Sequence, residues 1–211
     1  MLTKLKQKVQ QMLSAEARAA HRIGLTPNIV SCIGFVFAFL SALAYSMPTQ
    51  WLPMNWLLLS TPWFLVIAVI LLMVSGFCDT LDGILARNYQ QATAFGGFLD
   101  SLLDRYADAA VFAGIIIGGL CNPIVGLVAL AGSLLVSYSR ARAEAIGIKM
   151  ESIGLAERPE RIIILALFTI AAIYWLPALN IGIIVLAVLS NFTVLQRALH
   201  VYKTLKKGNK P

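Results

Sequence analysis

The longest stretch of the chain without a charged side chain is Ile23–Cys78, IGLTPNIVSCIGFVFAFLSALAYSMPTQWLPMNWLLLSTPWFLVIAVILLMVSGFC. Two further charge-free stretches follow it, Ala109–Ser139 and Ile162–Gln196. A helix that crosses a bilayer needs about 20 apolar residues, so the first and third stretches can each hold two spans. The middle stretch is divided by the turn sequence Gly118–Pro123, and its two helices must extend into charged sequence on either side. The pattern therefore predicts six membrane-spanning helices.

The composition agrees with an all-α integral membrane fold. Of the 211 residues, 59% are hydrophobic and 13% are charged, and the mean hydropathy is +0.79. A soluble domain would be about a quarter charged. The three cysteines are an odd, widely spaced set in apolar sequence, which argues against a disulfide framework or a zinc site. The predicted spans cover residues 27–46, 57–88, 93–118, 122–147, 159–176 and 180–204.

The distribution of lysine and arginine predicts the orientation. These residues gather in both termini and at the connections after the second and fourth spans, whereas the other connections are uncharged. By the positive-inside rule, both termini lie in the cytoplasm of a multi-pass cell-membrane protein. The net charge of +7 then reflects orientation and contact with anionic lipid, and no nucleic-acid partner is expected. Residues 1–22 alternate apolar and basic side chains, which predicts an amphipathic juxtamembrane helix on the cytoplasmic surface, and residues 23–211 are predicted to form one six-helix domain.

Four aspartates lie near the cytoplasmic ends of the second and third predicted spans: Asp79, Asp82, Asp100 and Asp104. A charged group inside a membrane helix costs about 2.5 to 3.5 kcal/mol, so such groups are rare unless paired, hydrated or bound to metal. Spacings of three and four residues put each pair on one helix face, and a short connection can turn the two faces together. Converging carboxylates repel one another unless a cation neutralises them. Because all the ligand atoms are oxygen, we predict Mg²⁺ or Mn²⁺ rather than zinc or iron.

The residues beside Asp82 favour a ligand with phosphate groups. Gly83 and Ala86 remove side chains next to this carboxylate, and Arg87 offers a bidentate fork for phosphate oxygens. Gly96–Gly97 thins the facing helix, so that a ligand can lie close to its backbone. Carboxylates that hold a divalent metal beside an arginine predict a substrate with a diphosphate, which makes Arg87 and the aspartates the candidate active site.

Taken together, these residues resemble the signature of the CDP-alcohol phosphatidyltransferases. The matching positions, at the spacing of that signature, are Asp79, Asp82, Gly83, Ala86, Arg87, Gly96, Asp100 and Asp104. A pattern with this many fixed positions is far more specific than a lone glycine motif. The resemblance covers nearly the whole chain, and the family also has six spans and an N-terminal surface helix.

The resemblance implies that a CDP-lipid donates its phosphatidyl or archaetidyl group to the hydroxyl of a small polar alcohol, with release of CMP. It implies two divalent ions held by Asp79, Asp82, Asp100 and Asp104. It also implies that Asp104 is the general base. The residues that would contact the CDP-lipid are Asp82, Gly83, Ala86, Arg87 and Thr93. Dimers are common in the family, so a homodimer is implied as well.

Arginines in the second half of the chain predict the acceptor. Arg140 lies at the end of the fourth predicted span, Arg158 at the start of the fifth and Arg197 late in the sixth. Three guanidinium groups from three helices could form a pocket for the phosphate of a phosphorylated alcohol. The tracts RARAEA and GLAERPER resemble the prokaryotic phosphatidylinositol phosphate and archaetidylinositol phosphate synthases, in which these positions contact the acceptor phosphate. Arg140 departs from the lysine of many members. The expected acceptor is inositol 1-phosphate.

Several alternatives stay open at this point. The arginines could instead anchor their helices at the interface by snorkelling. Within the family, the acceptor could be glycerol 3-phosphate, or a soluble CDP-inositol could replace the CDP-lipid. Asp108 and Arg105 could equally be ordinary interfacial charges. A cation transporter would also use buried carboxylates, but no ionisable residue continues such a path through the outer half of the membrane.

Overall fold

The computed structural model describes residues 14–50, 54–150 and 153–208, and these residues form seven helices. Their bounds are α2 Ser14–Arg22, α3 Pro27–Gln50, α4 Met54–Asn88, α5 Ala94–Ile117, α6 Pro123–Ala145, α7 Arg158–Tyr174 and α8 Pro177–Gly208. The helices α3 to α8 correspond to the six predicted spans, and every boundary lies within four residues of its predicted position. Most of the predicted surface helix, residues 1–22, falls outside the described residues, and α2 forms its last part.

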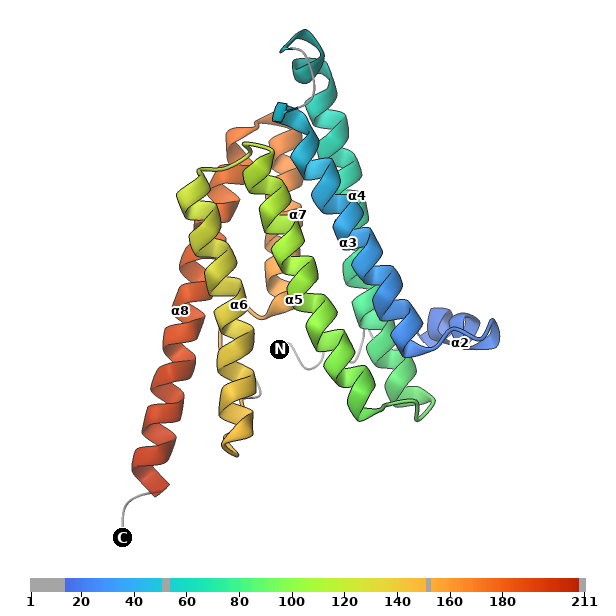
Figure 1. Ribbon diagram of the computed structural model, residues 1–211, viewed down its shortest axis with the longest axis vertical. Helices are drawn as coiled ribbons and strands as arrows, with labels where there is room; N and C mark the ends of the chain where they lie inside the picture. Colours follow the sequence, from blue (N-terminus) through green and yellow to red (C-terminus); the bar gives the residue numbers. More distant parts are fainter. Residues whose placement is uncertain (1–13, 51–53, 151–152, 209–211) are drawn as a thin grey trace.

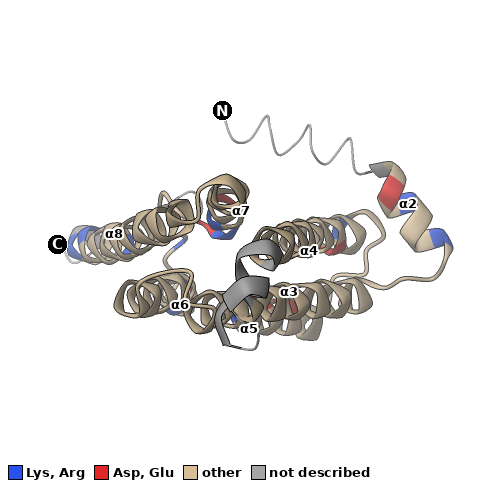
Figure 2. Cartoon of the chain, turned by 90° about the horizontal axis from the view of Figure 1, so that it is seen from above, with Lys and Arg blue, Asp and Glu red and all other residues tan. Residues whose placement is uncertain are grey.

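The six long helices form a closed ring. Seen along the bundle, α3, α5 and α6 make one row and α4, α7 and α8 make the other (Figure 2). The rows are joined because α3 packs on α4 and α5, α6 packs on α5 and α8, and α7 packs on α4 and α8. Helices α5 and α7 therefore face each other across the ring. The starts of α3, α5 and α7 lie at the same end of the bundle as the ends of α4 and α8 (Figure 1).

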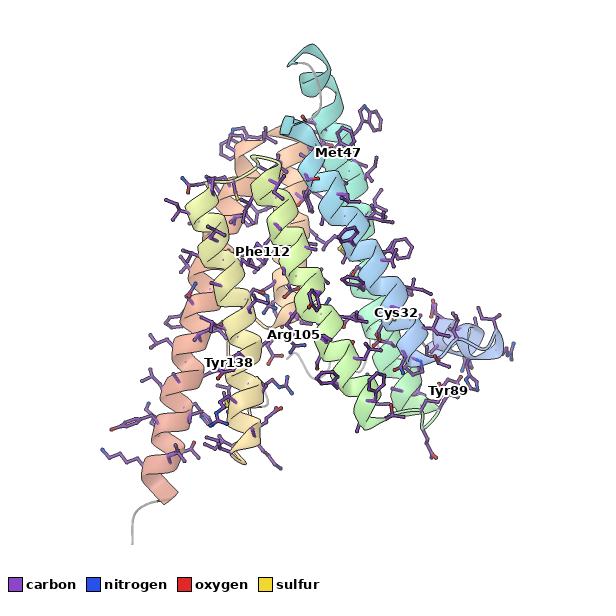
Figure 3. All side chains as sticks on the ribbon, viewed as in Figure 1. Cys32, Met47, Tyr89, Arg105, Phe112 and Tyr138 are labelled. Carbon is purple, nitrogen blue, oxygen red and sulfur yellow. The ribbon has the colours of Figure 1, made fainter. Side chains whose placement is uncertain are left out.

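The outer surface of the ring is apolar, as expected for contact with lipid. Phe112 is buried between the helices, whereas the outward-facing Tyr138 is 64% exposed (Figure 3). Four helices of the described part are long and apolar enough to cross a membrane, within Pro27–Met47, Thr61–Asn88, Pro123–Ala145 and Pro177–Lys206. The protein is therefore an all-α membrane protein. Helix α5 has 24 residues but carries several charges, and α7 has 17 residues, a length of about 26 Å.

Local sequence fixes the ends and contacts of the helices. Asn122 caps α6, because its side-chain oxygen accepts a hydrogen bond from the backbone N–H of Ile124 at 3.0 Å. Gly114 allows α5 to approach α3 closely, since a Cβ atom at this position would collide with the carbonyl group of Ala42. Helix α2 packs against α4, and the ring of His21 stacks on that of Tyr89 with their centroids 3.7 Å apart. The stacked rings join α2 to the chain just beyond the end of α4.

Candidate active site

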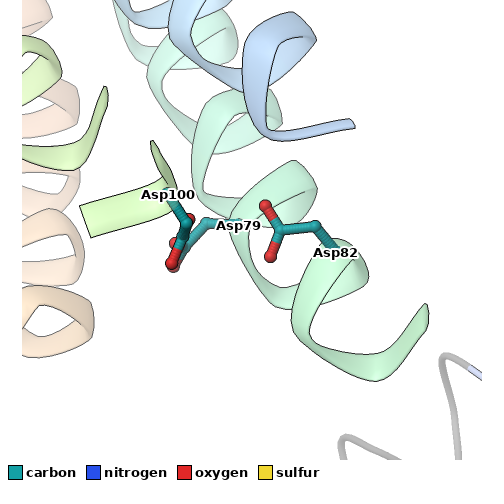
Figure 4. Close-up of side chains that lie close together, drawn as sticks. All are labelled: Asp79, Asp82 and Asp100. Atoms are coloured by element: carbon teal, nitrogen blue, oxygen red, sulfur yellow. The ribbon is translucent and has the colours of Figure 1, made fainter. Parts of the chain in front are cut away.

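Three carboxylates from two helices meet at one end of the ring. Asp79 and Asp82 come from α4 and Asp100 from α5, and one oxygen of each lies within 4.8 Å of the others (Figure 4). Asp82 is buried, and the other two are half-buried. Negatively charged oxygens at this separation repel one another unless a cation lies between them. The oxygen-only donor set fits a hard divalent ion such as Mg²⁺ or Mn²⁺.

The turn between α4 and α5 brings these carboxylates together. Gln90 in this turn has a φ of 54°, in the left-handed region that reverses the chain. Thr93, which we expected to contact the nucleotide, caps α5 by accepting a hydrogen bond from the N–H of Gly96 at 2.9 Å. A Cβ atom at Gly96 would lie 2.8 Å from Oδ1 of Asn28, whereas Gly97 faces open space. The close approach at Gly96 is therefore made by α3.

A hydroxyl group on α3 supports the cluster. Ser31 Oγ donates a hydrogen bond to Asp82 Oδ2 at 2.6 Å. Ser31 could not be predicted from the sequence as part of the site, because a single serine within an apolar helix does not indicate a function. Gly34, one turn further along α3, lies so close to α4 that a Cβ atom there would be 2.9 Å from Cβ of Cys78. Helices α3 and α4 are thus close enough for the serine to reach the carboxylate.

The fourth aspartate of the signature is joined to the cluster through an arginine. Asp104 lies one turn beyond Asp100 on α5, outside the group of three whose oxygens converge. Nη1 of Arg158 lies 2.7 Å from Oδ1 of Asp79 and 2.8 Å from Oδ1 of Asp104. Four carboxylates were predicted to converge on one point, and three of them do. Arg158, which was predicted only to bind the acceptor phosphate, also bridges two aspartates.

A further buried ion pair lies beside Arg158. Asp108 Oδ2 accepts hydrogen bonds from Arg161 Nη2 at 2.7 Å and from Ser133 Oγ at 2.9 Å. The other oxygen of Asp108 lies 3.5 Å from Nε of Arg158. The sequence left Asp108 open as an ordinary interfacial charge, whereas the structure buries it among three partners.

A polar cavity of about 580 Å³ adjoins the carboxylates, a volume typical of small-molecule sites. The arginines that line it are Arg87, Arg105, Arg140, Arg158, Arg161 and Arg197. Asp79, Asp100, Asp104 and Arg158 line both this cavity and the smaller pocket around the three carboxylates. The carboxylate cluster and the arginine-lined cavity therefore share one wall.

The three arginines expected to bind the acceptor all reach this cavity, in different settings. Arg140 is exposed, and its Nε lies 2.9 Å from Oε1 of Glu144. Arg197 is 2% exposed, and it donates hydrogen bonds to the carbonyl oxygens of Ile153 and Val136. Much of its hydrogen-bonding capacity is thus used within the protein, so Arg197 also ties α8 to the connection before α7.

The residues of the signature next to Asp82 lie at the end of α4. The guanidinium group of Arg87 lies over Gly83, where a Cβ atom would be 3.3 Å from Nη1 and Nη2. Ala86 is partly buried, and its carbonyl oxygen accepts a hydrogen bond from the N–H of Gln91 at 3.1 Å as α4 ends. Arg87 is exposed and lines the large cavity. Arg87 and Arg158 therefore both reach the cavity that adjoins the cluster.

Residues 24–195 match the family model described as CDP-alcohol phosphatidyltransferase. The chain belongs to this family. Among its relatives, an archaetidylinositol phosphate synthase of Pyrococcus horikoshii is 39% identical, covering 99% of this chain and all of that protein. A phosphatidylinositol phosphate synthase of Mycolicibacterium smegmatis is 36% identical, with 92% of this chain and 85% of that protein covered.

Solved structures of a CDP-alcohol phosphatidyltransferase agree with the fold. The phosphatidylinositol phosphate synthase of Mycobacterium tuberculosis with CDP-DAG bound matches with a TM-score of 0.75 and 32% identity, over 91% of this chain and 94% of that one. The same enzyme in complex with manganese and citrate matches with a TM-score of 0.74 over 90% and 88% of the two chains. The family assignment makes the protein a phosphatidyltransferase of phospholipid synthesis, and the carboxylate cluster supports binding of a divalent metal.

Proposed function

We propose that this protein transfers a phosphatidyl or archaetidyl group from a CDP-lipid to inositol 1-phosphate and releases CMP. The observation that carries the proposal is the wall shared by the carboxylate cluster and the arginine-lined cavity, which includes Asp79, Asp104 and Arg158. A metal-binding site for a diphosphate and a cationic site for a phosphate monoester would then lie side by side. The names of the relatives support the same pair of substrates.

Asp79, Asp82 and Asp100 are proposed to hold the divalent metal, with Asp104 completing a site for two ions. Their oxygen-only donor set fits Mg²⁺ or Mn²⁺. When bound, the metal supplies positive charge that offsets the charge of the diphosphate. The hydrogen bond from Ser31 keeps one oxygen of Asp82 in a fixed orientation.

The remaining parts of the signature are proposed to bind the CDP moiety. Arg87 offers two N–H groups to the phosphate oxygens, and Gly83 and Ala86 leave room for the nucleotide beside Asp82. Thr93 shapes the turn that follows, because its side chain caps α5. The backbone of this turn, rather than the Thr93 hydroxyl alone, would therefore surround the nucleotide.

Asp104 is proposed to act as the general base. Its carboxylate faces both the cluster and the large cavity, so an acceptor held in the cavity can present a hydroxyl group to it. The acceptor oxygen forms a bond to the phosphorus on the lipid side of the diphosphate, and the bond from that phosphorus to the bridging oxygen breaks. CMP leaves with the bonding electrons, and the hydroxyl proton goes to Asp104. Arg140, Arg158 and Arg197 hold the acceptor phosphate during this step.

The same proposal covers the arrangement in the membrane. Six helices, α3 to α8, would span the bilayer. Residues 1–22 would lie as an amphipathic helix on the cytoplasmic surface before the domain of residues 23–211. Both termini and the active site would face the cytoplasm. A homodimer is the proposed assembly, by analogy with the family.

The test is CMP release by the purified protein in detergent with Mg²⁺ and either CDP-diacylglycerol or CDP-archaeol. Inositol 1-phosphate, glycerol 3-phosphate, free inositol and serine are compared as acceptors. We expect release with inositol 1-phosphate alone. CMP release with glycerol 3-phosphate instead would support the proposed role of the carboxylates but contradict inositol 1-phosphate as the acceptor. No release with any acceptor would contradict the proposed function.

A further inference from the structure

A largely buried ion pair to which the proposed reaction gives no role lies in the wall of the arginine-lined cavity. Asp108 on α5 and Arg161 on α7 are joined by a hydrogen bond of 2.7 Å, and their side chains are 14% and 5% exposed. Removing two charges from water is costly, and a hydrophobic pair of similar size often gives the same stability. The position of this pair, next to Arg158, therefore needs an explanation beyond folding.

Asp108 divides its two oxygens between two arginines. Oδ2 accepts the hydrogen bond from Arg161, and Oδ1 lies 3.5 Å from Nε of Arg158. Ser133 on α6 also donates to Oδ2, at 2.9 Å. In turn, Nη1 of Arg161 donates to the carbonyl oxygen of Ala156 at 3.0 Å, two residues before Arg158. The pair thus contacts both the side chain of Arg158 and the backbone that leads to it.

Arg158 needs such support because of where it lies. It starts α7, and its guanidinium group crosses the ring to reach α5, a helix on which α7 does not pack closely. A free arginine side chain would lose about 2 kcal/mol of rotamer entropy on adopting one position. Asp108 lies one turn beyond Asp104 on the same face of α5. Its carboxylate forms an ion pair with the Nε edge of the guanidinium, without a hydrogen bond, while Nη1 lies between Asp79 and Asp104.

We propose that Asp108 and Arg161 are positioning residues that hold Arg158 at the wall between the carboxylate cluster and the arginine-lined cavity. The inference rests on the proposed function, in which Arg158 binds the phosphate group of the acceptor. Asp108 and Arg161 act through Arg158, and the CDP-lipid is bound by other residues. Loss of the pair should therefore weaken binding of the acceptor and leave binding of the CDP-lipid almost unchanged.

The experiment removes both charges together, because Asp108→Asn alone would leave Arg161 buried without a counter-ion. The double variant Asp108→Asn with Arg161→Gln keeps the size of the Asp108 side chain and leaves a shorter, uncharged polar side chain at position 161. Replacing both partners of a pair costs less stability than replacing one. We expect the Michaelis constant for inositol 1-phosphate to rise about tenfold, the effect of losing one charge-assisted contact. The constant for the CDP-lipid should stay within about twofold. The control is Ser41→Ala on the far part of α3, which removes a buried hydroxyl that donates a hydrogen bond to the carbonyl oxygen of Ala68 on α4.

A double-mutant cycle with Arg158→Ala separates positioning from a general loss of structure. If the pair acts through Arg158, adding the double variant to Arg158→Ala should change the acceptor constant by less than about twofold. Full additivity, or an unchanged constant in the double variant alone, would overturn the inference. Calorimetric titration with inositol 1-phosphate in the absence of CDP-lipid repeats the cycle without turnover. If titration gives the expected non-additive binding constants but no CMP is released, the proposed function is refuted and the positioning role stands. If glycerol 3-phosphate proves to be the acceptor, the same cycle is measured with glycerol 3-phosphate.

Discussion

Asp79 and Asp104 contact the same guanidinium group, but they differ in their other neighbours. Asp79 belongs to the group of three carboxylates that converge, whereas Asp104 lies beside it and faces the large cavity. Asp104 can therefore take up a proton while Asp79, Asp82 and Asp100 keep their place around the metal. This difference between two aspartates of one signature supports the role of general base that the resemblance to the family implies for Asp104.

Replacing Asp104 by asparagine tests this role. Asparagine keeps the size of the side chain but cannot accept the hydroxyl proton, so we expect turnover to fall by about 10²- to 10⁴-fold. Binding of the CDP-lipid, followed by calorimetry, should change little. Turnover close to that of the wild type would exclude Asp104 as the base.

Ser31 provides a second test at the scale of single residues. Because its hydroxyl orients Asp82, Ser31→Ala should raise the Mg²⁺ concentration for half-maximal CMP release by about 10-fold. Ser31→Thr, which keeps a hydroxyl group, should restore most of the affinity. An unchanged Mg²⁺ requirement in the alanine variant would show that the hydrogen bond does not support the metal site.

The sequence predicts only part of this site. The spacing of three residues places Asp79 and Asp82 on one helix face, and the short connection that follows predicted that Asp100 and Asp104 would meet them. The structure brings Asp100 to the pair, whereas Asp104 lies outside the converging group. The contacts of Ser31 and Asp108 could not be predicted, since each depends on which helices pack together in the ring. Nor does spacing indicate that a guanidinium group would lie between two members of the signature.

At the scale of the elements, the helix boundaries follow from charge and turn residues. The predicted starts of α5 and α6, at residues 93 and 122, lie within one residue of the observed starts. The structure adds that Thr93 and Asn122 cap these two helices. The order in which the helices pack around the ring could not be predicted from the sequence, since any apolar helix face can pack against another. The ring, with α5 opposite α7, is therefore a result of the structure alone.

The contact between α3 and α5 depends on one glycine. A side chain at Gly114 would collide with the backbone of Ala42, so Gly114→Val should lower the free energy of unfolding by about 1 to 3 kcal/mol or more. Gly97→Ala, on the same helix but facing open space, is the matched control and should leave the stability unchanged or slightly higher. Both are measured as thermal unfolding in detergent. Equal melting temperatures for the two variants would contradict the close packing.

At the scale of the whole molecule, the ring places all the charged chemistry at one end. The end of α4 and the starts of α5 and α7, which carry the carboxylate cluster and Arg158, lie at the same end of the bundle as α2 and the end of α8 (Figure 1). Helices α3, α4, α6 and α8 are apolar enough to lie in a membrane, and the site lies at one end of the ring that they help to form. A lipid-linked substrate and a water-soluble substrate can therefore meet there, at the membrane surface. This is the arrangement that the proposed reaction requires.

The predicted orientation can be measured by labelling cysteines in intact cells. In a variant without its native cysteines, Met47→Cys at the end of α3 should react with an impermeant reagent from outside. Lys203→Cys, near the end of α8, should react only after the membrane is opened. Labelling of Met47→Cys only from the cytoplasmic side would contradict the predicted orientation.

The most direct test of the central claim is mass spectrometry of the lipid formed from CDP-diacylglycerol or CDP-archaeol and inositol 1-phosphate in the presence of Mg²⁺. One lipid product should appear for each CMP released, carrying inositol with its phosphate monoester intact, and chelation of the metal should abolish it. A lipid that lacks the inositol phosphate group, or phosphatidic acid formed by hydrolysis alone, would contradict the claim that the carboxylate cluster and the arginine-lined cavity form one transferase site.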